Sequence, residues 1–168
     1  DVGAHREKHA MAYRTFDRAA DDAEPGDHAY LLLRGLFMTS YLAEDFLFDN
    51  GMFGAGQIVV SSASSKTAIA LAHSIRARGN THCIGLTSNG NVDFVNAVNL
   101  YDEVATYDNI SSLAEWAPTV YVDMAGNISV TAQVHEHFGD ALKYSCAIGA
   151  THWDQGGSKT NVPGVAPQ

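Results

Sequence analysis

The stretch "SSASSKT", residues 61–67, holds the closest group of side chains in this sequence that could do chemistry. It follows the apolar run "IVV" and precedes a segment with helical apolar spacing, which predicts a loop between a buried strand and a helix. The first turn of a helix offers unpaired N–H groups and the positive end of the helix dipole, and both suit a phosphate. We therefore expect a phosphate-binding loop, although it contains no glycine, the usual residue of such loops.

Two known phosphate-loop patterns can be compared with this stretch. The P-loop pattern G-x-x-x-x-G-K-[ST] matches only at its final pair, because Val60 and Ser65 stand at its glycine positions. The G-x-x-G-x-x-G variant of the dinucleotide loop places Ser62, Ser65 and Ala68 at the glycine positions, and all three side chains are small. The comparison favours a dinucleotide over a phosphotransferase site.

The rest of the chain predicts the elements that position this loop. Strands are expected at residues 57–61, 82–86, 102–107, 119–126 with its turn, and 141–150. Helices are expected at 5–20, 30–50, 66–78, 91–99, 109–116 and 128–138, with a turn at 21–27. Alternating strands and helices indicate an α/β fold, a Rossmann-like doubly wound parallel sheet of about five strands with an N-terminal helical segment. The expected parts are this segment (1–56), a nucleotide-binding domain (57–150) and a C-terminal loop or tail (151–168).

Composition narrows the classes of partner. The 168 residues carry a net charge of −9, which argues against a nucleic-acid partner. No apolar stretch approaches the roughly 20 residues of a membrane span, and no cationic, apolar leader opens the chain. Cys83 and Cys146 lack CxxC spacing and are expected to be buried free thiols in a reducing, cytoplasmic setting. In the strand order 3-2-1-4-5 their strands are three steps apart, too far for a disulfide.

The turn after the second strand bears on the choice of cofactor. NAD-selective sites place Asp or Glu near the end of that strand, where it binds the ribose hydroxyls. Here Thr87, Ser88 and Asn89 are neutral, which favours NADP(H) over NAD(H); an ordinary polar turn without a ligand explains them equally well. Lys66 is the nearest cation in sequence, and it can face the 2′-phosphate, the pyrophosphate or solvent.

Three further groups of residues are candidates for chemistry, and each has a structural alternative. Asp123 ends an apolar strand, where a carboxylate needs a partner, and either it or Asn127 can cap the following helix. His152 follows the fifth strand and is a possible proton donor, or a simple loop residue. The "HEH" triplet at 135–137 predicts no metal site, because residues two apart on a helix point about 200° apart.

The segments "SSASSKTAIALAHSIRARG", "CIGLTSNGN", "YDEVATYDNI", "VYVDMAGN" and "HFGDALKYSCAIGATHWD" resemble the nucleotide-binding half of the medium-chain dehydrogenase/reductase superfamily. They are most similar to a branch known as a domain of unknown function, which carries this serine-rich loop. The resemblance implies that Thr39 and Ser40 lie near the nicotinamide and that the turn with Ala125 and Gly126 passes beside it. Tyr41, which follows them, is a second candidate proton donor.

The expected function is thus an NADP(H)-binding domain of a zinc-independent oxidoreductase that transfers hydride to a carbonyl or an activated double bond. The superfamily's GroES-like substrate domain and sixth strand are not found in this sequence, and a homodimer is left open. The alternative is a non-catalytic nucleotide-binding or scaffold domain. The expected catalytic residues are His152 and Tyr41. The expected cofactor-binding residues are Thr39, Ser40, Ser62, Ser64, Ser65, Lys66, Thr67, Thr87, Ser88, Asn89, Ala125 and Gly126.

Overall fold

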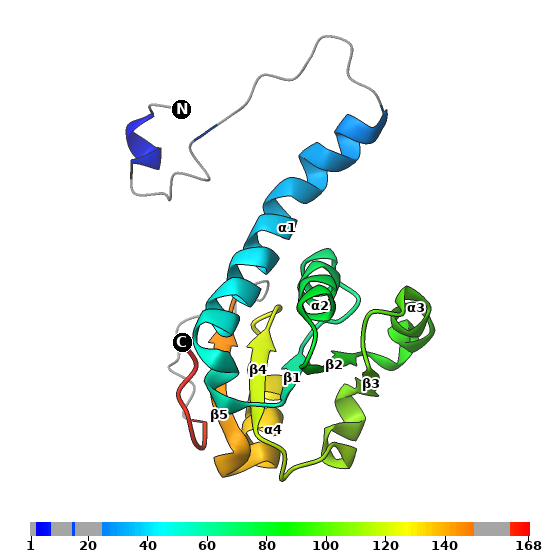
Figure 1. Cartoon of the computed structure of the whole chain (residues 1–168), viewed down its shortest axis with the longest axis vertical. Coiled ribbons are helices and arrows are strands. Elements are labelled where there is room, and N and C mark those ends of the chain that lie inside the picture. The colour runs from blue at the N-terminus through cyan, green and yellow to red at the C-terminus, as the bar shows by residue number, and fades with distance from the viewer. Residues whose placement is uncertain (1–2, 8–14, 16–24, 150–161) are drawn as a thin grey trace. The chain divides into compact units, whose positions relative to one another are not determined.

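A computed structural model describes residues 3–7, 15, 25–149 and 162–168 of the chain, and Figure 1 shows the parallel sheet that they contain. The strand order is β3-β2-β1-β4-β5, and every neighbouring pair is parallel. The strands are Gln57–Val60 (β1), His82–Thr87 (β2), Glu103–Thr106 (β3), Thr119–Asp123 (β4) and Leu142–Ala147 (β5). The predicted Rossmann-like α/β fold and its strand order are confirmed.

The α-helices of the described residues are Pro25–Asp49 (α1), Lys66–Arg78 (α2), Val92–Val98 (α3) and Ile128–Phe138 (α4). Short 3-10 segments include Ala4–Arg6, Gly51–Gly54 and Tyr107–Ser112 (η5). The chain divides into two compact units, Asp1–Leu33 and Arg34–Gln168. The sheet therefore belongs to the second unit, together with the part of α1 that starts at Arg34.

The central strands of the sheet are buried on both faces. Successive side chains point to opposite sides, and each side packs against other elements. Ile58 and Val60 pack in one cluster with Leu71 and Ile75 of α2, Val95 of α3 and Leu47 of α1. Val59 points the other way and packs with Val130 and Val134 of α4 and Ile110 of η5. Helices thus cover both faces, as a doubly wound sheet requires.

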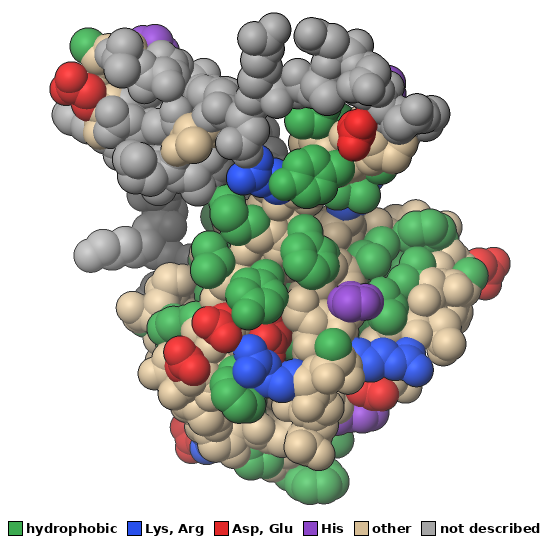
Figure 2. Space-filling model, turned by 45° about the horizontal axis from the view of Figure 1, so that its top comes forward, with side chains coloured by type: hydrophobic (Ala, Val, Ile, Leu, Met, Phe, Trp, Pro, Cys, Tyr) green, Lys and Arg blue, Asp and Glu red, His purple; other side chains and the backbone are tan. Residues whose placement is uncertain are grey.

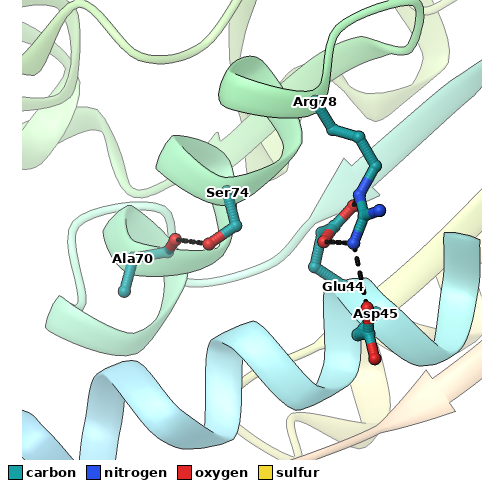
Figure 3. A network of polar contacts seen from close by, with 5 residues as sticks. All are labelled: Glu44, Asp45, Ala70, Ser74 and Arg78. Carbon is teal, nitrogen blue, oxygen red and sulfur yellow. Dashed lines mark hydrogen bonds and ion pairs between the residues drawn. The ribbon is translucent and has the colours of Figure 1, made fainter.

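A polar contact joins the end of α1 to the end of α2 (Figure 3). The Arg78 guanidinium lies 2.7 Å from Glu44 through Nε and donates to Asp45 at 3.0 Å through Nη2. Its carbon Cζ also lies 3.8 Å from the centre of the Phe48 ring. The two carboxylates hold the pKa of Arg78 above its ordinary value. One cation thereby joins three side chains of α1 to the helix that follows the phosphate-loop candidate.

The outer face of α1 in the second unit carries large apolar side chains that remain exposed, and Figure 2 shows hydrophobic groups gathered over this helix. These side chains are Leu36, Phe37, Tyr41, Leu42, Phe46 and Phe48. The side of α1 that packs on the rest of the unit is mixed instead, with Ser40 and Glu44 buried beside Leu47.

Two local predictions were wrong. Residues 109–116 do not form an α-helix; Tyr107–Ser112 is a 3-10 segment, and bends and turns follow it up to Pro118. The predicted turn at 21–27 is wrong for Pro25–Asp27, since α1 begins there, with proline at the first position, where its missing N–H costs nothing. Most of the helix predicted at 5–20 lies outside the described residues.

The two cysteines are free thiols, as predicted. Cys83 is buried and Cys146 half-buried, and burial raises the pKa of both, that of Cys83 to about 12. None of the described helices is long and apolar enough to cross a membrane.

Candidate functional site

One residue of the loop after β1 has a backbone conformation that favours glycine, and that residue is a serine. Ser62 has φ +52°, the left-handed region that favours glycine. This is the first glycine position of the variant pattern. Ser65 N–H donates to Ser62 O at 2.8 Å and closes the turn. Within the loop, the strained φ is thus confined to one residue, the second after the strand.

Two tyrosines and a strand hold this loop from the side of β2 and β3. Tyr107 Oη accepts from Ser62 N–H at 3.1 Å, and Tyr101 Oη donates to Ala63 O at 2.9 Å. Ala63 N–H donates to the carbonyl of Leu86 in β2 at 2.9 Å. Burial raises the pKa of Tyr101, so its hydroxyl stays a donor. The loop is therefore rigid before any ligand arrives.

The start of α2 leaves three backbone donors unused. Ser65 is the N-cap, and its hydroxyl accepts from Ala68 N–H at 3.2 Å. In the described part of the chain, no hydrogen bond uses the N–H groups of Ser64, Lys66 and Thr67. Lys66 is exposed, and the two other residues are half-buried. Three free donors at the positive end of a helix fit a phosphate group.

A buried carboxylate joins the loop after β1 to the turn after β4. Asp123 Oδ1 accepts from Ser61 Oγ at 2.8 Å and from the N–H groups of Ala125 and Gly126 at 3.0 and 3.1 Å. Its Oδ2 accepts from Thr131 Oγ1 at 3.1 Å. The alternative left open by the sequence is resolved, because Asn127 caps α4 and Asp123 closes the preceding turn.

The same turn is closed from the side of β5 by a glycine. A Cβ added to Gly149 would lie 1.8 Å from Met124 O, so no side chain fits there. The N–H groups of Ile148 and Gly149 both donate to Asp123 O, at 2.9 and 3.2 Å. Ala125 and Gly126, which the resemblance places beside a nicotinamide, thus belong to a turn fixed by β1, α4 and the end of β5.

The end of β2, which the sequence predicts to be neutral, has a carboxylate from another segment beside it. Thr87 is buried, while Ser88 and Asn89 are exposed at the carboxyl edge of the sheet. Asn89 Nδ2 donates to a carboxylate, Asp108 Oδ2, at 2.9 Å. The sequence analysis did not identify Asp108 as a site residue, because Asp108 follows a different strand, β3. The predicted strand order, in which β2 and β3 are neighbours, could have indicated it.

Of the candidates on α1, Ser40 contacts the first turn of α2. Ser40 is buried. Its hydroxyl oxygen lies within hydrogen-bond distance of two backbone carbonyls, Thr67 O at 2.7 Å and Leu36 O at 2.9 Å. Thr39 Oγ1 donates to Gly35 O at 3.0 Å. Both hydroxyls are thus engaged with backbone carbonyls. Tyr41 is about half exposed. The other candidate proton donor, His152, lies outside the described residues.

The histidine triplet has structural partners. His135 is fully buried, between Pro163 O at 3.0 Å and Ser145 Oγ at 2.9 Å, and His137 Nε2 lies 3.0 Å from Leu113 O. No group of three or more His, Cys, Asp or Glu among the described residues is placed to hold a metal ion.

Solved structures share this fold at low sequence identity. Benzyl alcohol dehydrogenase from Acinetobacter calcoaceticus matches with a TM-score of 0.58 and 12% identity, over 84% of this chain and 38% of its own. Galactitol-1-phosphate dehydrogenase from Escherichia coli matches at 0.57 and 12%, over 83% and 40%. A thermostable alcohol dehydrogenase from Pyrobaculum aerophilum matches at 0.53 and 16%, over 79% and 37%. The chain spans about two fifths of their length. The predicted resemblance to medium-chain dehydrogenases is confirmed as a likeness of fold.

Sequence comparison gives one family and no curated relative. The family described as "Protein of unknown function (DUF2855)" matches residues 1–165. No curated protein matches the chain.

Proposed function

Since the chain belongs to the family described as "Protein of unknown function (DUF2855)", we propose that it is a nicotinamide-dinucleotide-binding domain of an oxidoreductase. The observation that carries the proposal is the loop after β1. A left-handed Ser62 and three unused N–H groups of Ser64, Lys66 and Thr67 stand at the start of α2. In an open parallel sheet this is also the point between β1 and β4 where the strand order reverses and ligands bind.

The proposed roles follow from the contacts of each residue. The N–H groups of Ser64, Lys66 and Thr67 bind the pyrophosphate, and Ser65 orients them by capping α2. The turn with Ala125 and Gly126 borders the nicotinamide, and its rigidity comes from Asp123 and Gly149. Tyr41 is the described candidate for donating a proton to the substrate. When bound, the dinucleotide supplies the hydride, and the protein supplies position and electrostatics.

The finer parts of the proposal concern the cofactor form and the reaction. NADP(H) is proposed as the preferred form, supported by the neutral, donor-bearing side chains of Ser88 and Asn89 at the end of β2. The reaction is proposed as zinc-independent hydride transfer to a carbonyl or an activated double bond, with a substrate-binding domain from outside the present sequence. A cytoplasmic location and a homodimer belong to the same proposal.

A titration tests the proposal in two steps. NADPH and NADH are each added to the protein, and binding is followed by nicotinamide fluorescence. Quinones and enones are then added, and absorbance at the nicotinamide band is followed. We expect saturable binding, with NADPH bound more tightly than NADH, and absorbance loss where the substrate site is complete. Binding without turnover supports a non-catalytic nucleotide-binding domain, and absence of binding by both dinucleotides refutes the proposal.

A further inference from the structure

A carboxylate from another segment of the chain, that of Asp108 after β3, lies against the exposed turn after β2. Asp108 Oδ2 accepts from Asn89 Nδ2 at 2.9 Å, and both side chains are exposed. The contact follows from the sheet, in which Thr87 of β2 pairs with Thr106 of β3. Asn89 and Asp108 each stand two residues beyond that pair, so the parallel strands deliver them to the same edge.

A second amide, that of Asn91, joins the turn after β2 to the phosphate-loop candidate. Asn91 Nδ2 lies 3.2 Å from Ser64 Oγ and 3.2 Å from Ser88 Oγ, so one amide bridges the loop after β1 and the turn after β2. Ser64 carries one of the three unused N–H groups. A ligand whose phosphate lies on Ser64 and whose next group extends along Asn91 therefore reaches Ser88, Asn89 and Asp108.

The described residues that line the cleft beside Asp108 include two further acids and one histidine, His137, and no Lys or Arg. The sequence has no Lys or Arg between Arg78 and Lys143. Asp108 also lines a shallow cleft of about 390 Å³ whose other charged side chains include Glu115 and Glu136. Several carboxylates thus contribute to the negative potential around this cleft. Among them, Asp108 is the carboxylate that accepts a hydrogen bond from the turn after β2.

We infer that Asp108 is a specificity-determining residue of the dinucleotide site, one that keeps NAD(H) a competent ligand beside NADP(H). The inference rests on the proposed function. A ribose 2′-hydroxyl can donate a hydrogen bond to a carboxylate, whereas a 2′-phosphate in the same place is repelled by it. The neutral donors Ser88 and Asn89 favour the 2′-phosphate, and Asp108 opposes them from the neighbouring strand.

The test is a pair of titrations, with NADPH and with NADH, on the wild type, on Asp108→Asn and on Asp93→Asn. Asp93 is an exposed carboxylate in the first turn of α3 and serves as the matched control. We expect Asp108→Asn to raise the ratio of NADPH to NADH affinity about fivefold or more, within the range of one lost charge–charge contact. Asp93→Asn should leave the ratio within about twofold of the wild type. The gain should shrink at high salt, because exposed charges are screened.

Asp108→Ser provides the same comparison if the asparagine variant does not fold. An unchanged affinity ratio in a folded Asp108 variant that still binds both dinucleotides overturns the inference and leaves the proposed function intact. Absence of binding by the wild type refutes the proposed function, and the inference with it. A shift of equal size in Asp93→Asn also overturns the inference, because it would show a general effect of net charge.

Discussion

The carboxylate of Asp123 accepts a hydrogen bond of 2.8 Å from the hydroxyl of Ser61, across the neighbouring strands β1 and β4. The Ser61 hydroxyl in turn accepts from Met124 N–H at 2.9 Å. Both side chains are nearly inaccessible to water. The pair therefore fixes the spacing between the two segments that, in our proposal, contact the pyrophosphate and the nicotinamide of the dinucleotide.

Replacement of Asp123 by Asn should destabilise the protein and weaken dinucleotide binding together. The amide keeps one acceptor atom but loses the charge that strengthens four donated hydrogen bonds, those of Ser61, Ala125, Gly126 and Thr131. We expect a loss of about 2 kcal/mol in the free energy of unfolding, measured by urea denaturation. Asp93→Asn is the control and should change it by less than about 0.5 kcal/mol. Equal stability of Asp123→Asn and the wild type would show that the network carries little energy.

The sequence predicted the sheet well because its strands are short apolar runs separated by turn residues. "QIVV" at β1 and "TVYVD" at β4 are apolar on both faces, which only a covered sheet accommodates. The bounds of α2 were predicted as well, because residues 66–78 have helical apolar spacing. Where local signals suffice, the prediction and the structure agree.

The features of the site that the sequence did not predict depend on contacts between segments that are distant in the sequence. Asp108 reaches Asn89 only because β2 and β3 are adjacent, and Tyr107 reaches Ser62 across 45 residues of sequence. No periodicity encodes either contact. The helix predicted at 109–116 failed for a related reason, since Ile110 and Leu113 are buried as anchors of an irregular segment under α4. Apolar spacing alone does not separate such anchors from a helical face.

The buried thiol of Cys83 predicts a loss of stability at alkaline pH. Its pKa is about 12 in the folded protein, raised by burial and then by Asp102, against 9.0 ordinarily. Above pH 9 the unfolded chain releases this proton and the folded chain retains it, so stability falls as pH rises from about 9 towards 12. We expect the wild type to lose about 1 kcal/mol more than Cys83→Ala between pH 9 and pH 10. Urea denaturation at both values measures the difference, and parallel losses in the two proteins would contradict it.

Gly149 should tolerate no side chain. An alanine Cβ there would meet the carbonyl of Met124, whose oxygen is 1.8 Å and whose carbon is 2.5 Å away, and backbone cannot yield as a flexible side chain does. We expect Gly149→Ala to lower the free energy of unfolding by about 1–3 kcal/mol. It should also weaken NADPH binding, since the turn with Ala125 and Gly126 must move. Gly56→Ala, where an added Cβ meets nothing within 4 Å, is the control for alanine substitution as such. A Gly149→Ala protein as stable as the wild type would show that the segment around Gly149 relaxes freely.

The serine loop itself gives the last prediction, because Ser62 and Ser65 have different backbone conformations. Ser62 has φ +52°, so Ser62→Gly should be tolerated or stabilising, and Ser62→Val should destabilise the loop, since β-branched residues strongly disfavour this region. Ser65 has φ −75° and caps α2, so Ser65→Gly should cost only a few tenths of a kcal/mol. Ser65→Val removes the cap, costs about 1 kcal/mol, and adds a branched side chain next to the free N–H groups of Lys66 and Thr67.

NADPH affinity, measured by nicotinamide fluorescence on proteins of verified fold, separates these effects. Ser62→Gly and Ser65→Gly should bind within about threefold of the wild type, and both valine variants should bind more than about tenfold more weakly. Lys66→Ala should lose about 0.5–1.5 kcal/mol of binding free energy if its ammonium is a solvated partner of the phosphate. A folded Ser65→Val protein with unchanged affinity would make the hydroxyl cluster a helix cap alone and remove the phosphate from the start of α2.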